Sequence, residues 1–288
     1  MVNFIRNTIF WSNLSIAKQF WKRNSLCYFT NYNFDQIKDE IKQIHLFYFR
    51  KFCFLKVFFQ SNRRCILEEF THKNNYVEFF SIIKRIKQKD KIAVFDVGGN
   101  VGWFSLFLSL FLKGNIKFHV FEPLRENLYL LKKNLSKNNI KAKIFPVALS
   151  NKKKKTDVFV FTSSGATINK LQSKILKRIY KNHGRLKDTY AEKTLTTSLD
   201  ILFKEKKISG ADVIKIDAEG EEENIINGSK KIISLFNPII LCAYEHYSND
   251  KKRIISLVKS INPNYKLSES KNGNKILCFY QEKEIGYK

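Results

Sequence analysis

The pattern of hydrophobic and polar positions changes at Lys91. Beyond it, short apolar runs typical of buried strands alternate with longer segments whose apolar residues recur every three or four positions, as on one helix face. The predicted strands are residues 92–96, 118–121, 144–149, 157–161, 212–216, 239–244 and 275–281. The predicted helices are residues 101–112, 125–137, 221–236 and 251–260. This alternation predicts an α/β fold with a mainly parallel sheet, helices on both faces, and a ligand crevice beyond the carboxyl ends of the strands.

Two stretches depart from this alternation. Residues 162–196 are long and polar, and they form either a functional insertion at an edge of the sheet or a disordered surface loop. Residues 1–88 place many apolar side chains at helical spacing, which predicts a mostly helical cap. We therefore expect two parts, an accessory N-terminal region at 1–88 and a ligand-binding domain at 89–288.

Within the N-terminal region, residues 46–59 interleave Phe and Tyr with three cations. The segment is too short to span a bilayer. We predict a helix that packs on the ligand-binding domain or on a second subunit. In the alternative interpretation the segment lies in a lipid interface, with buried rings and snorkelling cations, as a peripheral membrane contact.

The most informative residues follow the first predicted strand of the ligand-binding domain. An acid there leads into a turn of small and polar residues, after which a helical pattern begins: Asp96, Gly98, Gly99, Asn100 and Gly102. Glycines allow a sharp turn and let a ligand approach main-chain N–H groups closely. The next strand ends at Glu122, where folds of this kind place a carboxylate that accepts hydrogen bonds from both hydroxyls of a ribose.

The spacing of this turn is D-x-G-x-N-x-G. It is neither the G-x-G-x-x-G of dinucleotide sites nor the P-loop pattern. A ligand that has no phosphates but carries a cationic sulfonium and an α-amino group would suit the acid at Asp96. S-adenosylmethionine therefore fits this turn better than NAD.

Five blocks, all within residues 92–247, resemble the FkbM-type S-adenosylmethionine-dependent methyltransferases: residues 95–102, 119–128, 147–150, 197–200 and 214–220. The run Lys-Ile-Asp-Ala-Glu-Gly that ends the last block is the most diagnostic. The resemblance implies a class I methyltransferase (Rossmann-like) fold, S-adenosylmethionine as cofactor, and O-methylation, often of sugars or polyketide-like products. On the cofactor side, the blocks also contain Pro123, Ala148 and Leu149. The family usually has Ala at the position of Gly99, an exchange that we expect the turn to tolerate.

Several of these residues fall at the ends of successive parallel strands, so they should line one rim of the sheet: Asp96, Glu122, Ala148, Asp217 and Glu245. If the methyl acceptor is a hydroxyl, a base must take its proton. The candidates by position are Asp217, Glu245 and His246, and Glu219 lies beside Asp217 in the diagnostic block.

Other interpretations of these polar residues remain open. The pKa of a free histidine would suit His246 to proton transfer at neutral pH, although a packing or surface role is the alternative. We interpret the acids at 221–223 as solvated residues at a helix start. A Mg²⁺ ion held by Asp217 and a neighbouring acid has no distinctive spacing behind it, so we predict no metal site.

The formal net charge of +26 would suit a nucleic-acid partner. Because the basic residues are spread along the whole chain, we do not expect such a partner, and an anionic glycan or a membrane surface explains the charge equally well. The predicted acceptor is a glycan or a small molecule. The alternative function is a non-catalytic nucleotide-fold module that binds RNA or a membrane surface through its basic face, but the intact glycine turn and Glu122 favour an enzyme.

The five cysteines are widely spaced and include no C-x-x-C pair. No disulfide framework or zinc site is therefore expected. The first thirty residues contain four cations and no uninterrupted apolar core of the kind found in secretory signals. These features predict a cytoplasmic protein, with peripheral attachment to a membrane as the alternative.

Overall fold

The computed structural model describes residues 26–29, 41–48, 53–60, 76, 79–80, 82–83, 91–112, 115–160, 166–170, 173–174, 177, 190–244, 250–270 and 275–282. In this part of the chain, the main sheet has seven strands in the order β13 (Lys266–Glu269), β14 (Ile276–Tyr280), β12 (Ile239–Ala243), β11 (Val213–Ile216), β4 (Lys91–Val97), β5 (Asn115–Phe121) and β6 (Ala142–Phe145).

The five strands from β12 to β6 run parallel, and β14 is antiparallel to both β12 and β13. Numbered along the chain, the parallel strands lie in the order 3-2-1-4-5 from β6 to β12. The order reverses between β4 and β11, and ligands of doubly wound sheets bind at such a reversal. The predicted Rossmann-like α/β fold is confirmed.

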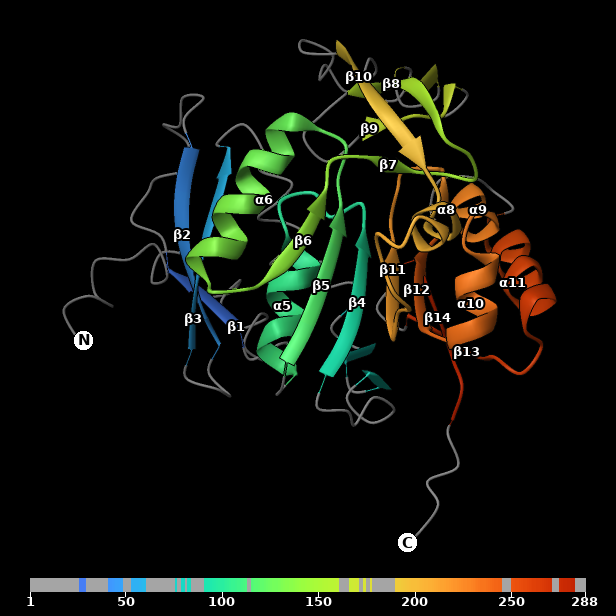
Figure 1. Cartoon of the computed structure of the whole chain (residues 1–288). Coiled ribbons are helices and arrows are strands. Elements are labelled where there is room, and N and C mark those ends of the chain that lie inside the picture. Colours follow the sequence, from blue (N-terminus) through green and yellow to red (C-terminus); the bar gives the residue numbers. More distant parts are fainter. Residues whose placement is uncertain are drawn as a thin grey trace, which may run out of the picture.

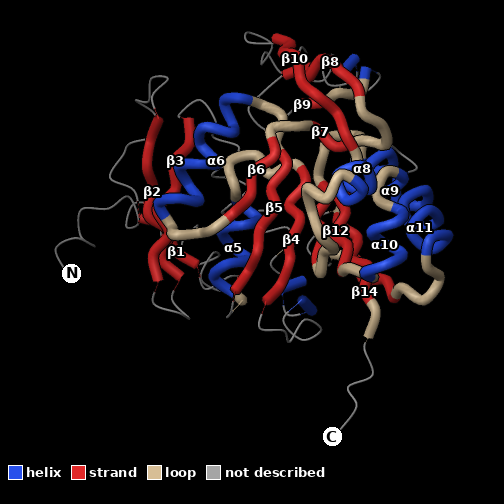
Figure 2. Tube along the Cα trace, viewed as in Figure 1, coloured by secondary structure: helices blue, strands red, loops and turns tan. Residues whose placement is uncertain are grey.

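Two layers of helices cover the sheet (Figures 1 and 2). On one face, α5 (Trp103–Phe111) and α6 (Arg125–Lys137) bury apolar residues together with Phe79, Phe80 and Ile83. The other face carries α8 (Leu199–Lys204), α9 (Glu222–Asn227), α10 (Lys230–Phe236) and α11 (Asp250–Ile261). Strand residues on both faces are buried, as expected for parallel strands between two helical layers.

A second, four-stranded sheet lies beyond the carboxyl ends of β4 and β5 (Figure 1). Its order is β7 (Ala148–Leu149), β10 (Tyr190–Thr197), β8 (Lys154–Val160) and β9 (Ala166–Thr167). The single strand expected at 144–149 is therefore wrong, because β6 ends at Phe145 and the chain changes sheets across Pro146, which has no N–H for a ladder bond. The end of the expected insertion at 162–196 is also a strand, since β10 pairs along β8.

The helical prediction for residues 1–88 is wrong where the structure describes strands. An antiparallel sheet is formed by β1 (Leu26–Phe29), β2 (Ile41–Tyr48) and β3 (Cys53–Gln60), and β3 lies beside α6 (Figure 1). Of the aromatic segment at 46–59, residues 46–48 lie in β2 and residues 53–59 in β3, and Phe47 pairs with Phe54. A dense apolar run satisfies helical and strand spacing equally, and Phe, Tyr, Ile and Val favour strands.

The helix predicted at 221–236 is divided into α9 and α10 around Gly228 and Ser229. A Cβ at Gly228 would collide with the carbonyl oxygen of Ser150. The Asp200 carboxylate accepts hydrogen bonds from the backbone N–H groups of Lys231 and Ile232 and so caps α10 from another element. In the residues that the structure describes, no helix is both long and apolar enough to cross a membrane.

Candidate cofactor and active site

The glycine turn after β4 is held against the end of β5. The N–H groups of Gly98 and Gly99 both donate to the carbonyl oxygen of Phe121, each at 3.0 Å, and Gly102 N–H donates to Gly99 O at 2.8 Å. Gly98 has φ +71° and Gly102 has φ +95°, a region that side chains with a Cβ rarely adopt. A Cβ at Gly98 would also overlap the carbonyl oxygen of Asp217. Only glycine fits that position.

Gly99 is constrained by a neighbouring side chain. A Cβ there would overlap Cγ1 of Val120 on β5. Since the branched side chain of valine has little rotamer freedom, an alanine at this position would require Val120 to move. The family's usual alanine would therefore require Val120 to shift in this chain, whereas Gly99 leaves the turn unstrained.

Glu122 joins the turn to the start of α6. Its Oε2 accepts a hydrogen bond from the backbone N–H of Asn100 at 2.8 Å. Its Oε1 accepts from the N–H of Leu124 at 3.0 Å and from Nδ2 of Asn127 at 3.1 Å. The side chain is buried, and burial raises its pKa against the opposing effect of these hydrogen bonds. The described residues thus use three of roughly four acceptor positions on the carboxylate, which leaves room for a ligand hydroxyl.

Asn100 presents an acceptor that the described part of the chain does not satisfy. Its backbone has φ +46°, and its side-chain Oδ1 is buried without a hydrogen bond among the described residues. Leaving a buried acceptor unpaired costs free energy, so a polar group is expected to meet it. A ligand donor at the turn would supply that group.

Asp96 lies buried beneath the glycine turn and pairs with Lys215. It is fully buried, its Oδ2 accepts a hydrogen bond from Ser105 Oγ at 2.8 Å, and its Oδ1 lies 3.3 Å from Nζ of Lys215. The two residues of this ion pair are register partners on β4 and β11. The contact between Asp96 and a cationic ligand that the turn pattern indicated does not fit this burial, because the carboxylate has no exposed surface.

Lys215, to which the sequence analysis gave no role although it begins the diagnostic run, is the central cation among the described residues of the site. Its ammonium donates to the carbonyl oxygens of Val97 at 3.1 Å and Gly98 at 2.7 Å. Burial lowers its pKa, but the charges of Asp96, Asp217 and Glu122 raise it above the ordinary value, so Lys215 stays protonated. The sequence feature that could have identified Lys215 is its position inside an otherwise apolar buried strand, Val213–Ile216.

The turn after β11 carries Asp217 and Glu219. Asp217 N–H donates to Val97 O at 3.2 Å, which places its backbone beside Gly98. Glu219 has φ +53° in a turn that closes around the carboxylate of Glu222. That carboxylate accepts from the N–H groups of Ala218 at 2.8 Å and Gly220 at 3.0 Å.

The interpretation of 221–223 as solvated acids is wrong for the first two residues. Glu221 and Glu222 are both buried. Glu221 Oε2 accepts from Ser150 Oγ at 2.9 Å, which connects this turn to the residue that follows β7. Buried carboxylates that accept several hydrogen bonds fix loop shape, so these acids hold the rim in place.

The other predicted residues are distributed as follows. Ala148 and Leu149 are buried in β7, whose partner strand is β10. Pro123 follows Glu122 and is partly buried. Glu245 and His246 lie outside the described residues. Among the described side chains, no group of three or more His, Cys, Asp or Glu is placed to hold a metal ion.

We call the glycine turn, Glu122 and Asp217 at the carboxyl ends of β4, β5 and β11 the corner of the sheet. The order of the strands and this corner together define a class I, Rossmann-like methyltransferase fold. The profile of the Methyltransferase FkbM domain matches residues 96–266, more than half of the chain, and the protein therefore belongs to the FkbM methyltransferase family. Membership implies, in general terms, S-adenosylmethionine as the methyl donor. The search of curated proteins found no match.

Solved structures similar to this chain include several methyltransferases. Methyltransferase FkbM from Methylobacillus flagellatus KT is 18% identical, with a TM-score of 0.49 over 66% of this chain and 44% of that protein. Precorrin-6y C5,15-methyltransferase from Geobacter metallireducens GS-15 is 12% identical, with a TM-score of 0.40 over 71% and 88%. The N-terminal domain of human METTL16 is 15% identical, with a TM-score of 0.44 over 74% and 71%. The chain spans less than half the length of the Methylobacillus protein.

Proposed function

We propose that the protein transfers a methyl group from S-adenosylmethionine to a hydroxyl oxygen of a glycan or small molecule. The observation that carries the proposal is the Glu122 carboxylate, which is tied through Asn100 N–H to the glycine turn at the reversal point of the sheet. A buried carboxylate at this position suits the hydroxyls of a ribose. The oxygen acceptor rests on the family resemblance.

The charges and polar groups of the corner fit this cofactor. The chain as a whole carries a net charge of +26, yet among the described residues of the corner the charges of Asp96, Glu122 and Asp217 all act on one buried cation, Lys215. Three carboxylates against one ammonium favour a ligand that brings positive charge, such as a sulfonium with an α-amino group. The unpaired Oδ1 of Asn100 offers an acceptor for one of its donors.

When bound, S-adenosylmethionine supplies an electrophilic methyl group, and the protein aligns the acceptor for in-line attack and excludes water. We assign Glu122 and the glycine turn to binding. Asp217 follows β11 with its backbone against Val97 O, beside the turn. From there its carboxylate would take the proton of the acceptor hydroxyl.

Titration calorimetry with S-adenosylmethionine and S-adenosylhomocysteine tests the cofactor assignment. We expect Glu122→Gln to weaken binding of both by about tenfold or more, because hydrogen bonds to charged groups contribute about 1.5–3 kcal/mol and the new amide N–H group would face backbone donors. The control is Glu205→Gln, which changes a surface carboxylate paired with Lys153 and Lys207. Absence of binding to the unaltered protein would overturn the assignment and favour a non-catalytic module.

A second variant separates chemistry from binding. We expect Asp217→Asn to keep cofactor affinity within a few-fold while lowering turnover by about 10²-fold, the usual scale for a lost acid–base group. Methyl transfer is followed with tritium-labelled S-adenosylmethionine and glycan extract from the host cells. Near-normal turnover of the variant would exclude Asp217 as the base. Lost affinity for S-adenosylmethionine with normal turnover at saturation would make Asp217 a binding residue.

A further inference from the structure

A residue upstream of the family domain reaches the site. The hydroxyl of Tyr76 donates a hydrogen bond to Oδ2 of Asp217 at 3.0 Å, across 141 residues of sequence. The family domain begins only at residue 96. The Tyr76 ring lies edge-on to Phe104 of α5 with 5.5 Å between centroids, and Lys215 Nζ lies 5.9 Å from the centre of the ring. Tyr76 thus contacts three residues at or beside the site, namely Asp217, Phe104 and Lys215.

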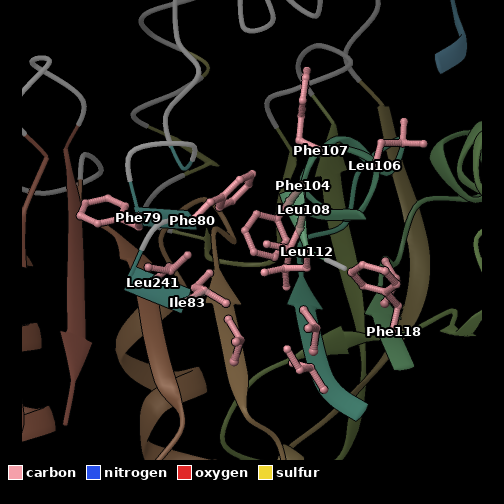
Figure 3. Close-up of a cluster of buried hydrophobic side chains, with 14 of the residues drawn as sticks. Phe79, Phe80, Ile83, Phe104, Leu106, Phe107, Leu108, Leu112, Phe118 and Leu241 are labelled. Carbon is pink, nitrogen blue, oxygen red and sulfur yellow. The ribbon is translucent and has the colours of Figure 1, made fainter. Parts of the chain in front are cut away.

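The segment that carries Tyr76 is anchored in the core. Phe79, Phe80 and Ile83 are at most 2% exposed and pack in the cluster beneath α5. Phe80 is edge-on to Phe104 with centroids 5.8 Å apart, and Figure 3 shows the two rings side by side. Phe79 N–H also donates to Tyr76 O at 3.1 Å. A hydroxyl held by an anchored turn keeps a defined position, which is what orientation of a catalytic group requires.

The Tyr76 hydroxyl remains protonated, and so remains a hydrogen-bond donor, at any physiological pH. Burial raises the pKa of Tyr76 well above its ordinary value, and the neighbouring charge of Asp217 raises it further. The hydroxyl therefore stays protonated and can only donate to the carboxylate. Among the described residues, the side-chain hydrogen bond to Asp217 falls on Oδ2, so the two oxygens of this carboxylate are not equivalent.

We propose that Tyr76 is a positioning residue for methyl transfer, which holds Asp217 by Oδ2 and leaves Oδ1 to receive the proton of the acceptor. This inference rests on the proposed function. In the step, an electron pair of the acceptor oxygen forms the new O–C bond while the C–S bond breaks toward sulfur. The proton of the acceptor hydroxyl passes to Oδ1 of Asp217, and S-adenosylhomocysteine is released. The N-terminal region would then complete the active site of the family domain.

Tyr76→Phe removes only the hydroxyl and keeps the ring against Phe104. With tritium-labelled S-adenosylmethionine and host glycan extract, we expect turnover at saturation to fall at least fivefold and KM for S-adenosylmethionine to stay within twofold. In the Asp217→Asn background the same change should cause little further loss. Tyr129→Phe, which alters a tyrosine 56% exposed on α6, is the matched control and should leave both parameters unchanged.

A double-mutant cycle on thermal unfolding tests the contact without any acceptor. Tyr76→Phe should lower the Tm by about 2–4 °C in the unaltered protein and by clearly less in an Asp217→Ala background, because the hydroxyl has then lost its partner. If Asp217→Ala does not fold, Asp217→Leu, which keeps the branched shape of the side chain without an acceptor, takes its place. If the two substitutions lower the Tm additively, the contact itself is contradicted. If their effects on the Tm are coupled but Tyr76→Phe leaves turnover unchanged, the positioning role of Tyr76 is contradicted. Failure of S-adenosylhomocysteine to bind would instead refute the proposed function.

Discussion

His119 is the clearest pH-sensitive group at the scale of single residues. It lies in β5, only 1% exposed, between the rings of Phe95 and Phe145. Burial, together with the charges of Lys117 and Lys143, lowers its pKa from 6.5 to about 4. The imidazole is therefore neutral in the folded protein at pH 7, and protonating it requires a charge inside an aromatic cluster.

This shift predicts a loss of stability in mild acid. Between pH 6.5 and about 4 the unfolded chain binds a proton at residue 119 that the folded protein does not, so the free energy of unfolding falls as the pH falls, by up to about 1.4 kcal/mol per pH unit. His119→Phe, which suits the surrounding rings, should remove this part of the slope. Urea unfolding of both proteins at several pH values measures it, and identical slopes would contradict the prediction.

At the scale of elements, the junction between β4 and β11 limits what the glycine turn tolerates. The glycine turn taken from the sequence alone predicts that Gly98→Val abolishes ligand binding while leaving much of the sheet intact. In the structure, a Cβ at Gly98 collides with the backbone of Asp217, the residue directly after β11, and a backbone carbonyl cannot rotate away as a side chain can. Substitution there must separate the ends of two central strands.

We therefore expect Gly98→Ala to lower the free energy of unfolding by about 3 kcal/mol or more, as well as weakening binding of S-adenosylhomocysteine. Gly102→Ala provides the comparison. It also has a positive φ, but its nearest new contact is the Cδ1 methyl of Leu131 at 3.0 Å, the end of a side chain that can move. Urea unfolding should show the smaller loss for Gly102→Ala, and equal losses would argue against the backbone collision.

At the scale of the whole molecule, the core does not stop where the sequence pattern changes. Phe79, Phe80 and Ile83 lie within the expected accessory region at 1–88, yet they belong to the same buried cluster as α5 and α6 (Figure 3). A division of the chain at residue 88 would cut through this cluster. Phe79, Phe80 and Ile83 are thus part of the structural unit that holds the site.

Truncation of Phe80 tests whether these N-terminal residues contribute to the same core as α5 and α6. Phe80→Ala should lower the free energy of unfolding by about 3–5 kcal/mol, the usual cost of removing a buried aromatic ring. Leu235→Ala, at a position 56% exposed on α10, should change it by no more than about 0.5 kcal/mol. Both values come from urea unfolding monitored by circular dichroism. A small effect of Phe80→Ala would mean that the N-terminal segment is only loosely attached.

The doubly wound sheet and the place of its ligand corner follow from local features of the amino-acid sequence. Apolar runs and helical spacing are such features, and parallel strands bring their carboxyl ends to one edge, so the sequence pattern alone assigns Gly98, Glu122 and Asp217 to that edge. The same reasoning failed for β2 and β3, because closely spaced aromatic residues fit a period of two as well as one of 3.6.

Which side chains meet at that edge depends on the tertiary structure. The pairing of Lys215 with Asp96 depends on the register of β11 on β4, and the bond from Tyr76 to Asp217 spans 141 residues. The bond from Ser150 to the buried Glu221 likewise joins residues that are 71 positions apart in sequence. Such contacts are set by the packing of whole elements, and no local pattern of residues encodes them.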